Sequence, residues 1–210
     1  PMTVEEVLAI ARRETGVEES PPDSNNVKYN TWYYGKPVNG PAYPWCMVFV
    51  QWVFAEAGDP LPFRTASCSA LLNWYKRNEP DRVVKTPEPG DIVIYEFGHT
   101  GIIDRVEKDA ISAIEGNTSA SESGSQSNGG VVAQRLRKMS LVEAYIRPDY
   151  QEGPHMDNTP SPSYREGVEW AVENGILRGN KEGNLLLSQP VSRQQLCTML
   201  YRLAKLYGLE

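Results

Sequence analysis

Three kinds of side chain that together support nucleophilic catalysis follow one another along this chain: a thiol, an imidazole and a carboxylate. Cys46 lies in AYPWCMVFVQWVFAEAG (42–58), directly after Pro-Trp and before a run of mostly apolar residues. His99 lies in EFGHTGIID, and Glu115 and Asn117 lie in AIEGN. A nucleophilic cysteine needs a base, and that base needs an orienting partner. These four residues are therefore the candidate catalytic set.

The residues around Cys46 predict a helix that is buried on nearly all sides. Pro44 suits the approach to a first turn, Gly58 suits the end, and few positions between them are polar. Cys46 would then lie in the first turn, where free N–H groups and the helix dipole favour a thiolate. A cysteine that is only a small buried hydrophobic residue fits this position equally well.

His99 and Glu115 fall on two short strands, 98–107 and 110–117, which together predict a hairpin. Side chains alternate along a strand, so a three-residue turn at 107–109 would place both on one face. In that register His99 lies opposite Asn117 and Gly101 opposite Glu115. The alternative is a core histidine with satisfied hydrogen bonds and a glutamate at the rim.

Other segments supply the scaffold for these residues. A capping box at Thr3–Glu6 predicts a helix that ends near Gly16. A second helix is predicted at about 67–77, and further strands are predicted at 90–97, 131–138 and 142–148. The Gly/Ser-rich segment 116–130 is either a mobile flap or a solvated hairpin tip.

Aromatic residues are concentrated in the loop-like segment before Cys46. Trp32, Tyr33 and Tyr34 lie among proline, glycine and asparagine residues, and Trp45 precedes the cysteine. Trp32, Tyr34 and Trp45 are the candidate substrate-binding residues; packing in the core explains aromatic side chains equally well.

Composition excludes several classes of function. The net charge of −6 leaves no basic face for nucleic acid or anionic lipid, and no run of about 18 apolar residues predicts a membrane span. Three cysteines and two histidines argue against a disulfide framework and a structural zinc site, so no cofactor or metal is expected. The first residues lack the pattern of a signal peptide.

The last 60 residues predict a linker and a small helical module. Residues 150–162 are rich in proline and glycine, and GPHM (153–156) resembles a protease-site and cloning-site remnant, so His155 is discounted. Capping boxes at Ser163 and Ser192 predict two helices. The predicted organisation is a domain at 1–149, a linker at 150–162 and a module at 163–210.

The motifs YPWCMVFVQWVF, PGDIVIY, GHTGIID and IEGN occur in the order found in the CHAP domain (cysteine, histidine-dependent amidohydrolase/peptidase), which residues 1–147 resemble. This resemblance implies an α+β, papain-like fold with helices packed on an antiparallel sheet. It implies that Cys46 is the nucleophile, His99 the general base, Glu115 the residue that orients it, and Asn117 an additional polar member. It gives no reason to expect calcium, because the loop before Cys46 offers only Asp23.

The C-terminal segment VEWAVENGILRGNKEGNLLLSQPVSRQQLCTMLYRL resembles one S-layer-homology repeat, a module of wall-anchoring proteins. This resemblance implies a small all-α module that binds a secondary wall polymer or forms homo-oligomers.

The two resemblances together imply a peptidoglycan hydrolase of the bacteriophage endolysin type, held in the host cytoplasm until lysis and then active on the wall. Peptidoglycan is the expected partner, and an N-acetylmuramoyl-L-alanine amidase is the expected activity. Two alternatives remain: an endopeptidase that cuts the stem or cross-bridge peptide, and a non-catalytic wall-binding protein.

Overall fold

The computed structural model describes residues 2–121, 123–151, 157–181 and 183–209. The chain divides into two compact units, residues 1–151 and 152–210. The GPHM segment and His155 lie outside the described residues. No helix within the described ranges is long and apolar enough to cross a membrane.

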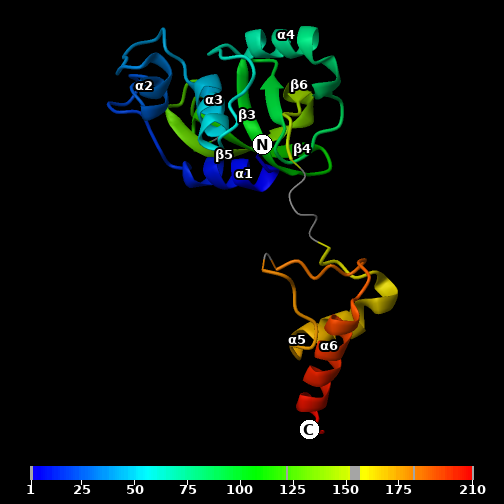
Figure 1. Ribbon diagram of the computed structural model, residues 1–210. Coiled ribbons are helices and arrows are strands. Elements are labelled where there is room, and N and C mark those ends of the chain that lie inside the picture. Colours follow the sequence, from blue (N-terminus) through cyan, green and yellow to red (C-terminus); the bar gives the residue numbers. More distant parts are fainter. Residues whose placement is uncertain (1, 122, 152–156, 182, 210) are drawn as a thin grey trace. The chain divides into compact units, whose positions relative to one another are not determined.

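The first unit is an α+β structure, as predicted, with helices packed on an antiparallel sheet (Figure 1). Its helices are α1 (Val4–Arg13), α2 (Lys28–Tyr34), α3 (Cys46–Glu56) and α4 (Cys68–Asn78), with short 3-10 turns η1 (Pro80–Arg82) and η2 (Met139–Leu141). Its strands are β1 (Val83–Val84), β2 (Ile92–Tyr95), β3 (His99–Val106), β4 (Ala110–Thr118), β5 (Val131–Lys138) and β6 (Val142–Ile146). They form one sheet in the order β1-β6-β2-β3-β4-β5.

The central helix is α3, and its burial follows from its composition. Eight of its residues are buried, and it packs against β3 and β4 on the sheet and against α1 and α2 beside it (Figure 1). The predicted helix that is apolar on nearly all sides is therefore confirmed. Because α3 is enclosed by other elements, the position of its first residue is fixed by the whole core.

Helix α2 is a difference from the sequence prediction, which treated its residues as loop. Tyr29 from this helix is fully buried and stacks on Trp45 with ring centroids 5.4 Å apart. It also contacts Phe49 edge to face at 5.1 Å. These tertiary contacts outweigh the local turn signals, and Gly35, at φ 72°, ends the helix in the left-handed region.

The turn between β3 and β4 also differs from the prediction. Instead of three residues at 107–109, the turn has two, 108–109, and the Glu107 N–H donates to the Ala110 carbonyl at 2.8 Å. By itself this turn would put His99 and Glu115 on opposite faces of the sheet.

A β-bulge reverses that effect. The register shifts by one residue at Asp104, so that Ile102 pairs with Ile114 on the far side of the bulge. This is the register in which His99 and Glu115 share a face. The predicted facing is thus correct, but the bulge produces it rather than the turn.

The second unit contains η3 (Pro162–Tyr164), α5 (Arg165–Glu173) and α6 (Arg193–Leu206). The predicted capping box at Ser192 is confirmed, with the Gln195 N–H donating to the Ser192 hydroxyl at 3.2 Å. The one at Ser163 is wrong, because that residue lies inside the 3-10 turn and Tyr164 is the N-cap without a side-chain bond.

Candidate active site

Cys46 is the first residue of α3, and a buried tryptophan anchors the start of this helix. Trp45 is the N-cap residue; its ring stacks on Tyr29, and its indole N–H donates to the Glu19 carboxylate at 3.4 Å. Cys46 itself is 6% exposed. Its sulfur therefore lies beside the unpaired N–H groups of the first turn, in a nearly water-free position.

His99 is the first residue of β3, and a short hairpin fixes its position. The loop 96–98 returns the chain after Tyr95, which pairs with His99, and Gly98 adopts a φ of 75°. The imidazole is fully buried and stacks on Tyr95 and Phe97, with centroids 6.0 and 5.8 Å away. The stacking holds the plane of the ring, so its two nitrogens point in fixed directions.

Glu115 on β4 holds one of these nitrogens. Its carboxylate is fully buried, and Oε2 lies 3.0 Å from His99 Nε2. Gly101 makes room for it, because a Cβ there would lie 2.7 Å from Glu115 Cγ. Gly101, the second glycine of the GHTGIID motif, therefore leaves the space in which the Glu115 side chain reaches His99.

Arg137 on β5 completes the arrangement, and sequence reasoning missed it. Its guanidinium holds the Glu115 carboxylate at two points, with Nε donating to Oε1 at 3.0 Å and Nη2 donating to Oε2. The Arg137 side chain is 7% exposed. The long segment between β4 and β5 hides this pairing from the sequence, since no short turn sets their register.

The charges along this line alternate in sign. Burial opposes the ionised form of Glu115, but Arg137 and His99 outweigh it and lower the pKa of the carboxyl. Burial likewise opposes the imidazolium, but the adjacent Cys46 sulfur and Glu115 raise the pKa of His99 to about 9. Hydrogen bonding with Cys68 lowers the pKa of the Cys46 thiol well below its ordinary value, burial opposes the shift, and His99 adds to it.

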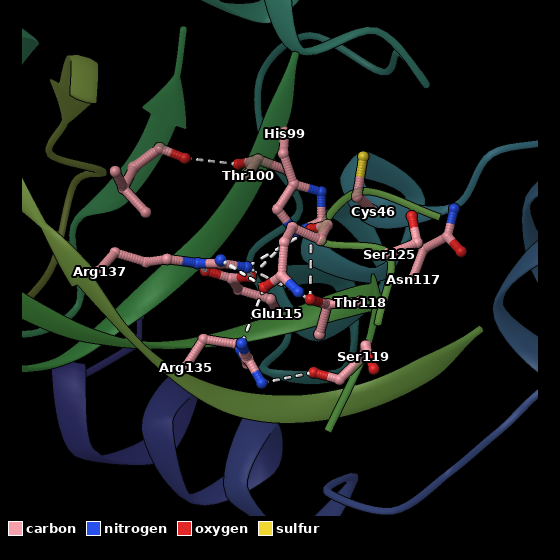
Figure 2. A network of polar contacts seen from close by, with 12 residues as sticks. Cys46, His99, Thr100, Glu115, Asn117, Thr118, Ser119, Ser125, Arg135 and Arg137 are labelled. Carbon is pink, nitrogen blue, oxygen red and sulfur yellow. Dashed lines mark hydrogen bonds and ion pairs between the residues drawn. The ribbon is translucent and has the colours of Figure 1, made fainter. Parts of the chain in front are cut away.

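The remaining nitrogen of His99 is the one available to the thiol. Nδ1 is buried and has no hydrogen-bond partner within the described residues, while Nε2 is occupied by Glu115. Figure 2 shows the His99 ring beside Cys46, with Glu115 and Arg137 on its other side. A thiolate and an imidazolium placed in this way can attack a carbonyl carbon and protonate a leaving nitrogen.

Asn117 lies close to His99 and Glu115, but its side chain bonds to the segment that leads to β5. It lies within the irregularity of β4 between Glu115 and Thr118 and has a φ of 55°. Its amide nitrogen donates to Asn128 Oδ1, and its amide oxygen accepts from the Gly130 N–H, both at 3.3 Å. Both ends of the amide thus close the 118–130 segment, so Asn117 shapes the edge of the site.

The three aromatic candidates separate into two groups. Trp45 is fully buried, so the expectation that it lines a substrate groove is wrong; its ring anchors α3 instead. Trp32 and Tyr34 on α2 are partly exposed. The Arg64 guanidinium lies 4.5 Å from the Trp32 ring centroid, and Tyr34 contacts Tyr43 edge to face at 5.1 Å.

No group of three or more His, Cys, Asp or Glu residues that could hold a metal ion occurs among the described residues.

A family model described as the CHAP domain matches residues 38–117. The CHAP match contains Cys46, His99, Glu115 and Asn117 and ends before Arg137. No curated protein matches the chain. A solved structure, the crystal structure of a wild-type endolysin, LysIME-EF1, aligns over 82% of this chain and 86% of its own, with 15% identity and a TM-score of 0.48.

The buried ion pair gives a direct prediction. Arg137→Met keeps the length of the side chain but removes the charge, leaving Glu115 buried without its main partner. We expect the free energy of unfolding of the first unit to fall by about 3–5 kcal/mol. Urea unfolding followed by near-ultraviolet circular dichroism measures this loss.

The matched control is Arg105→Met, which breaks an exposed ion pair with Glu107 (3.0 Å). That pair is open to solvent, so its loss should cost about 0–1 kcal/mol. Equal losses for the two variants would show that the Arg137 pair is no more important than a surface contact.

Proposed function

We propose that this chain is a peptidoglycan hydrolase of the endolysin type that cleaves an amide bond of the bacterial cell wall through the Cys46 thiolate. The observation that carries the proposal is the orientation of His99: Glu115 holds Nε2, and buried Nδ1 is left free for the thiol and the substrate. The CHAP match, which spans these residues, supports the same chemistry.

The proposed reaction has two stages. The Cys46 thiolate attacks the amide carbonyl carbon, and the resulting oxyanion receives hydrogen bonds from N–H groups at the start of α3, including that of Cys46. The His99 imidazolium gives its proton to the leaving nitrogen as the C–N bond breaks and a thioester forms. Neutral His99 then takes a proton from water, which attacks the thioester and releases the acid and the thiolate.

Glu115 and Arg137 act on His99 and not on the substrate. The carboxylate fixes the ring and stabilises its charged form, and the guanidinium keeps the carboxylate ionised despite its burial. Trp32 and Tyr34, partly exposed on α2, are proposed to contact the glycan or peptide.

We further propose that the bond cleaved joins the muramic acid to L-alanine, which makes the enzyme an N-acetylmuramoyl-L-alanine amidase. The second unit is proposed to be an S-layer-homology-like module that binds wall polymer or associates with other copies. No residue of α5 or α6 is buried, and α6 exposes Leu196, Leu200 and Tyr201. An exposed apolar surface of this kind is typical of a binding surface.

Substitution of the nucleophile tests the activity. Full-length protein should release new L-alanine N-termini from purified peptidoglycan while leaving the stem peptides intact, as mass spectrometry of the digest would show. Cys46→Ala should release none, because the variant lacks the thiolate that His99 stabilises for attack on the carbonyl carbon.

Binding serves as the control for that variant, since Cys46→Ala should still sediment with whole walls. Cleavage within the peptides would instead identify the protein as an endopeptidase. Undiminished lysis by Cys46→Ala would refute the cysteine mechanism, and inactivity of the parent protein on walls that it binds would favour a non-catalytic binding protein.

The charge of His99 predicts the alkaline limit of the reaction. Its pKa is raised to about 9, so the imidazolium that protonates the leaving nitrogen is present below that pH and lost above it. Initial rates on peptidoglycan should therefore decline above about pH 9. Circular dichroism at each pH checks that the fold persists; a rate that declines already at pH 7–8, or still rises at pH 10, contradicts this assignment.

Removal of the second unit tests its proposed role. A chain ended after Gln151 keeps that residue's N–H bond to the Met2 carbonyl (2.9 Å), so the last contact of the first unit is retained. We expect this chain to cleave soluble peptidoglycan fragments like the parent but to bind whole walls more weakly in sedimentation assays. Binding equal to that of the full chain would assign wall targeting to the first unit.

A further inference from the structure

A second cysteine lies against the proposed nucleophile. Cys68 is the first residue of α4, and its Sγ lies 3.9 Å from Cys46 Sγ. Cys68 is buried, at 8% exposed, and its sulfur also lies 3.9 Å from the Gly98 carbonyl oxygen. The thiol thus stands between the nucleophile and the residue that precedes His99.

Two thiols at this separation in a buried site cannot both ionise near neutral pH, because two like charges would face each other without water between them. One proton therefore remains on the pair. Cys46 faces the His99 imidazolium, which favours a thiolate there. Cys68 faces a carbonyl oxygen, which accepts a hydrogen and disfavours a second negative charge. The proton thus belongs on Cys68.

We propose that Cys68 is a positioning residue for the nucleophile, and that its S–H donates a hydrogen bond to the Cys46 thiolate. This inference rests on the proposed role of Cys46 as the nucleophile. It adds a thiol donor, supplied by a different helix, to the His99 imidazolium and the backbone N–H groups of α3.

The Gly98 carbonyl gives this donor a second acceptor. When Cys46 becomes acylated, its sulfur loses the negative charge and accepts hydrogen bonds poorly. The Cys68 S–H can then turn to the Gly98 oxygen, so that a buried donor keeps a partner throughout the reaction. Resolution of the thioester returns the charge and the hydrogen bond to Cys46.

The surrounding groups fit this assignment. Hydrogen bonding with Cys46, burial and the charge of Cys46 all raise the pKa of Cys68 above its ordinary value. The other titratable groups that act on the pair are His99 on β3, which favours the Cys46 thiolate, and Glu143 on β6, whose negative charge further disfavours ionisation of Cys68.

Alkylation of the full-length protein tests the donor. Parent, Cys68→Ala and Cys68→Ser would react with iodoacetamide from pH 4 to 10 under reducing conditions, with each cysteine quantified by mass spectrometry of its peptide. Exposed Cys197 serves as the internal reference for reagent activity. Removal of the donor in Cys68→Ala should raise the apparent pKa of Cys46 by about one unit, leaving about tenfold less thiolate below that pKa.

Cys68→Ser keeps a hydroxyl donor and should hold the apparent pKa of Cys46 close to that of the parent. A merely structural role for Cys68 would change the thermal stability of both variants without moving the alkylation profile. An unmoved profile in folded Cys68→Ala overturns the inference.

The reciprocal variant covers the case in which Cys68→Ala does not fold. In Cys46→Ser the neighbouring negative charge is gone, so alkylation of Cys68 should begin at lower pH than in the parent. An unchanged Cys68 profile would also overturn the inference. The readout is alkylation, not lysis, so loss of this coupling leaves the proposed hydrolase intact, and active Cys46→Ala would refute the hydrolase mechanism without affecting the coupling.

Discussion

The buried carboxylate of Glu115 is the constraint on which the rest of the site depends. A fully buried negative charge is unfavourable unless cations and hydrogen bonds compensate it, and two strands supply them here: His99 from β3 and Arg137 from β5. The bulge at Asp104 is needed for the first of these contacts, and Gly101 provides the space for the carboxylate. Three neighbouring strands of the sheet thus contribute to the position and charge of the Glu115 carboxylate.

The same electrostatic logic extends to the thiol. Glu115 stabilises positive charge on His99, and His99 in turn stabilises negative charge on Cys46, so the line from Arg137 to the sulfur alternates in sign. Packing fixes the position of the residue that carries this thiol. Because α3 is enclosed by the core and Trp45 anchors its first turn, the backbone of Cys46 is held in place beside the imidazole. Burial of an apolar helix therefore serves the chemistry at its end.

The second unit has a much smaller core than the first. Among its described residues, Ile176 and Asn184 are buried, at 8% and 3% exposed. In contrast, buried apolar clusters lie on both faces of the sheet in the first unit. A short two-helix segment encloses a small core. All four candidate catalytic residues lie in the first unit, so the proposed wall cleavage and the proposed wall binding are assigned to separate parts of the chain.

The sequence by itself determined what depends on local pattern: the α+β class, helix α3 with Cys46 in its first turn, the hairpin that carries His99 and Glu115, and the capping box at Ser192. Capping, periodicity and strand alternation act over a few residues, so they can be read from the chain. Tertiary structure alone decided the bulge at Asp104, the burial of Trp45, and the contacts of Arg137 and Cys68 with the site. Long connections separate Trp45, Arg137 and Cys68 from their partners. No local pattern sets a bulge, a strand register or a sulfur–sulfur distance between elements that only the packed core brings together.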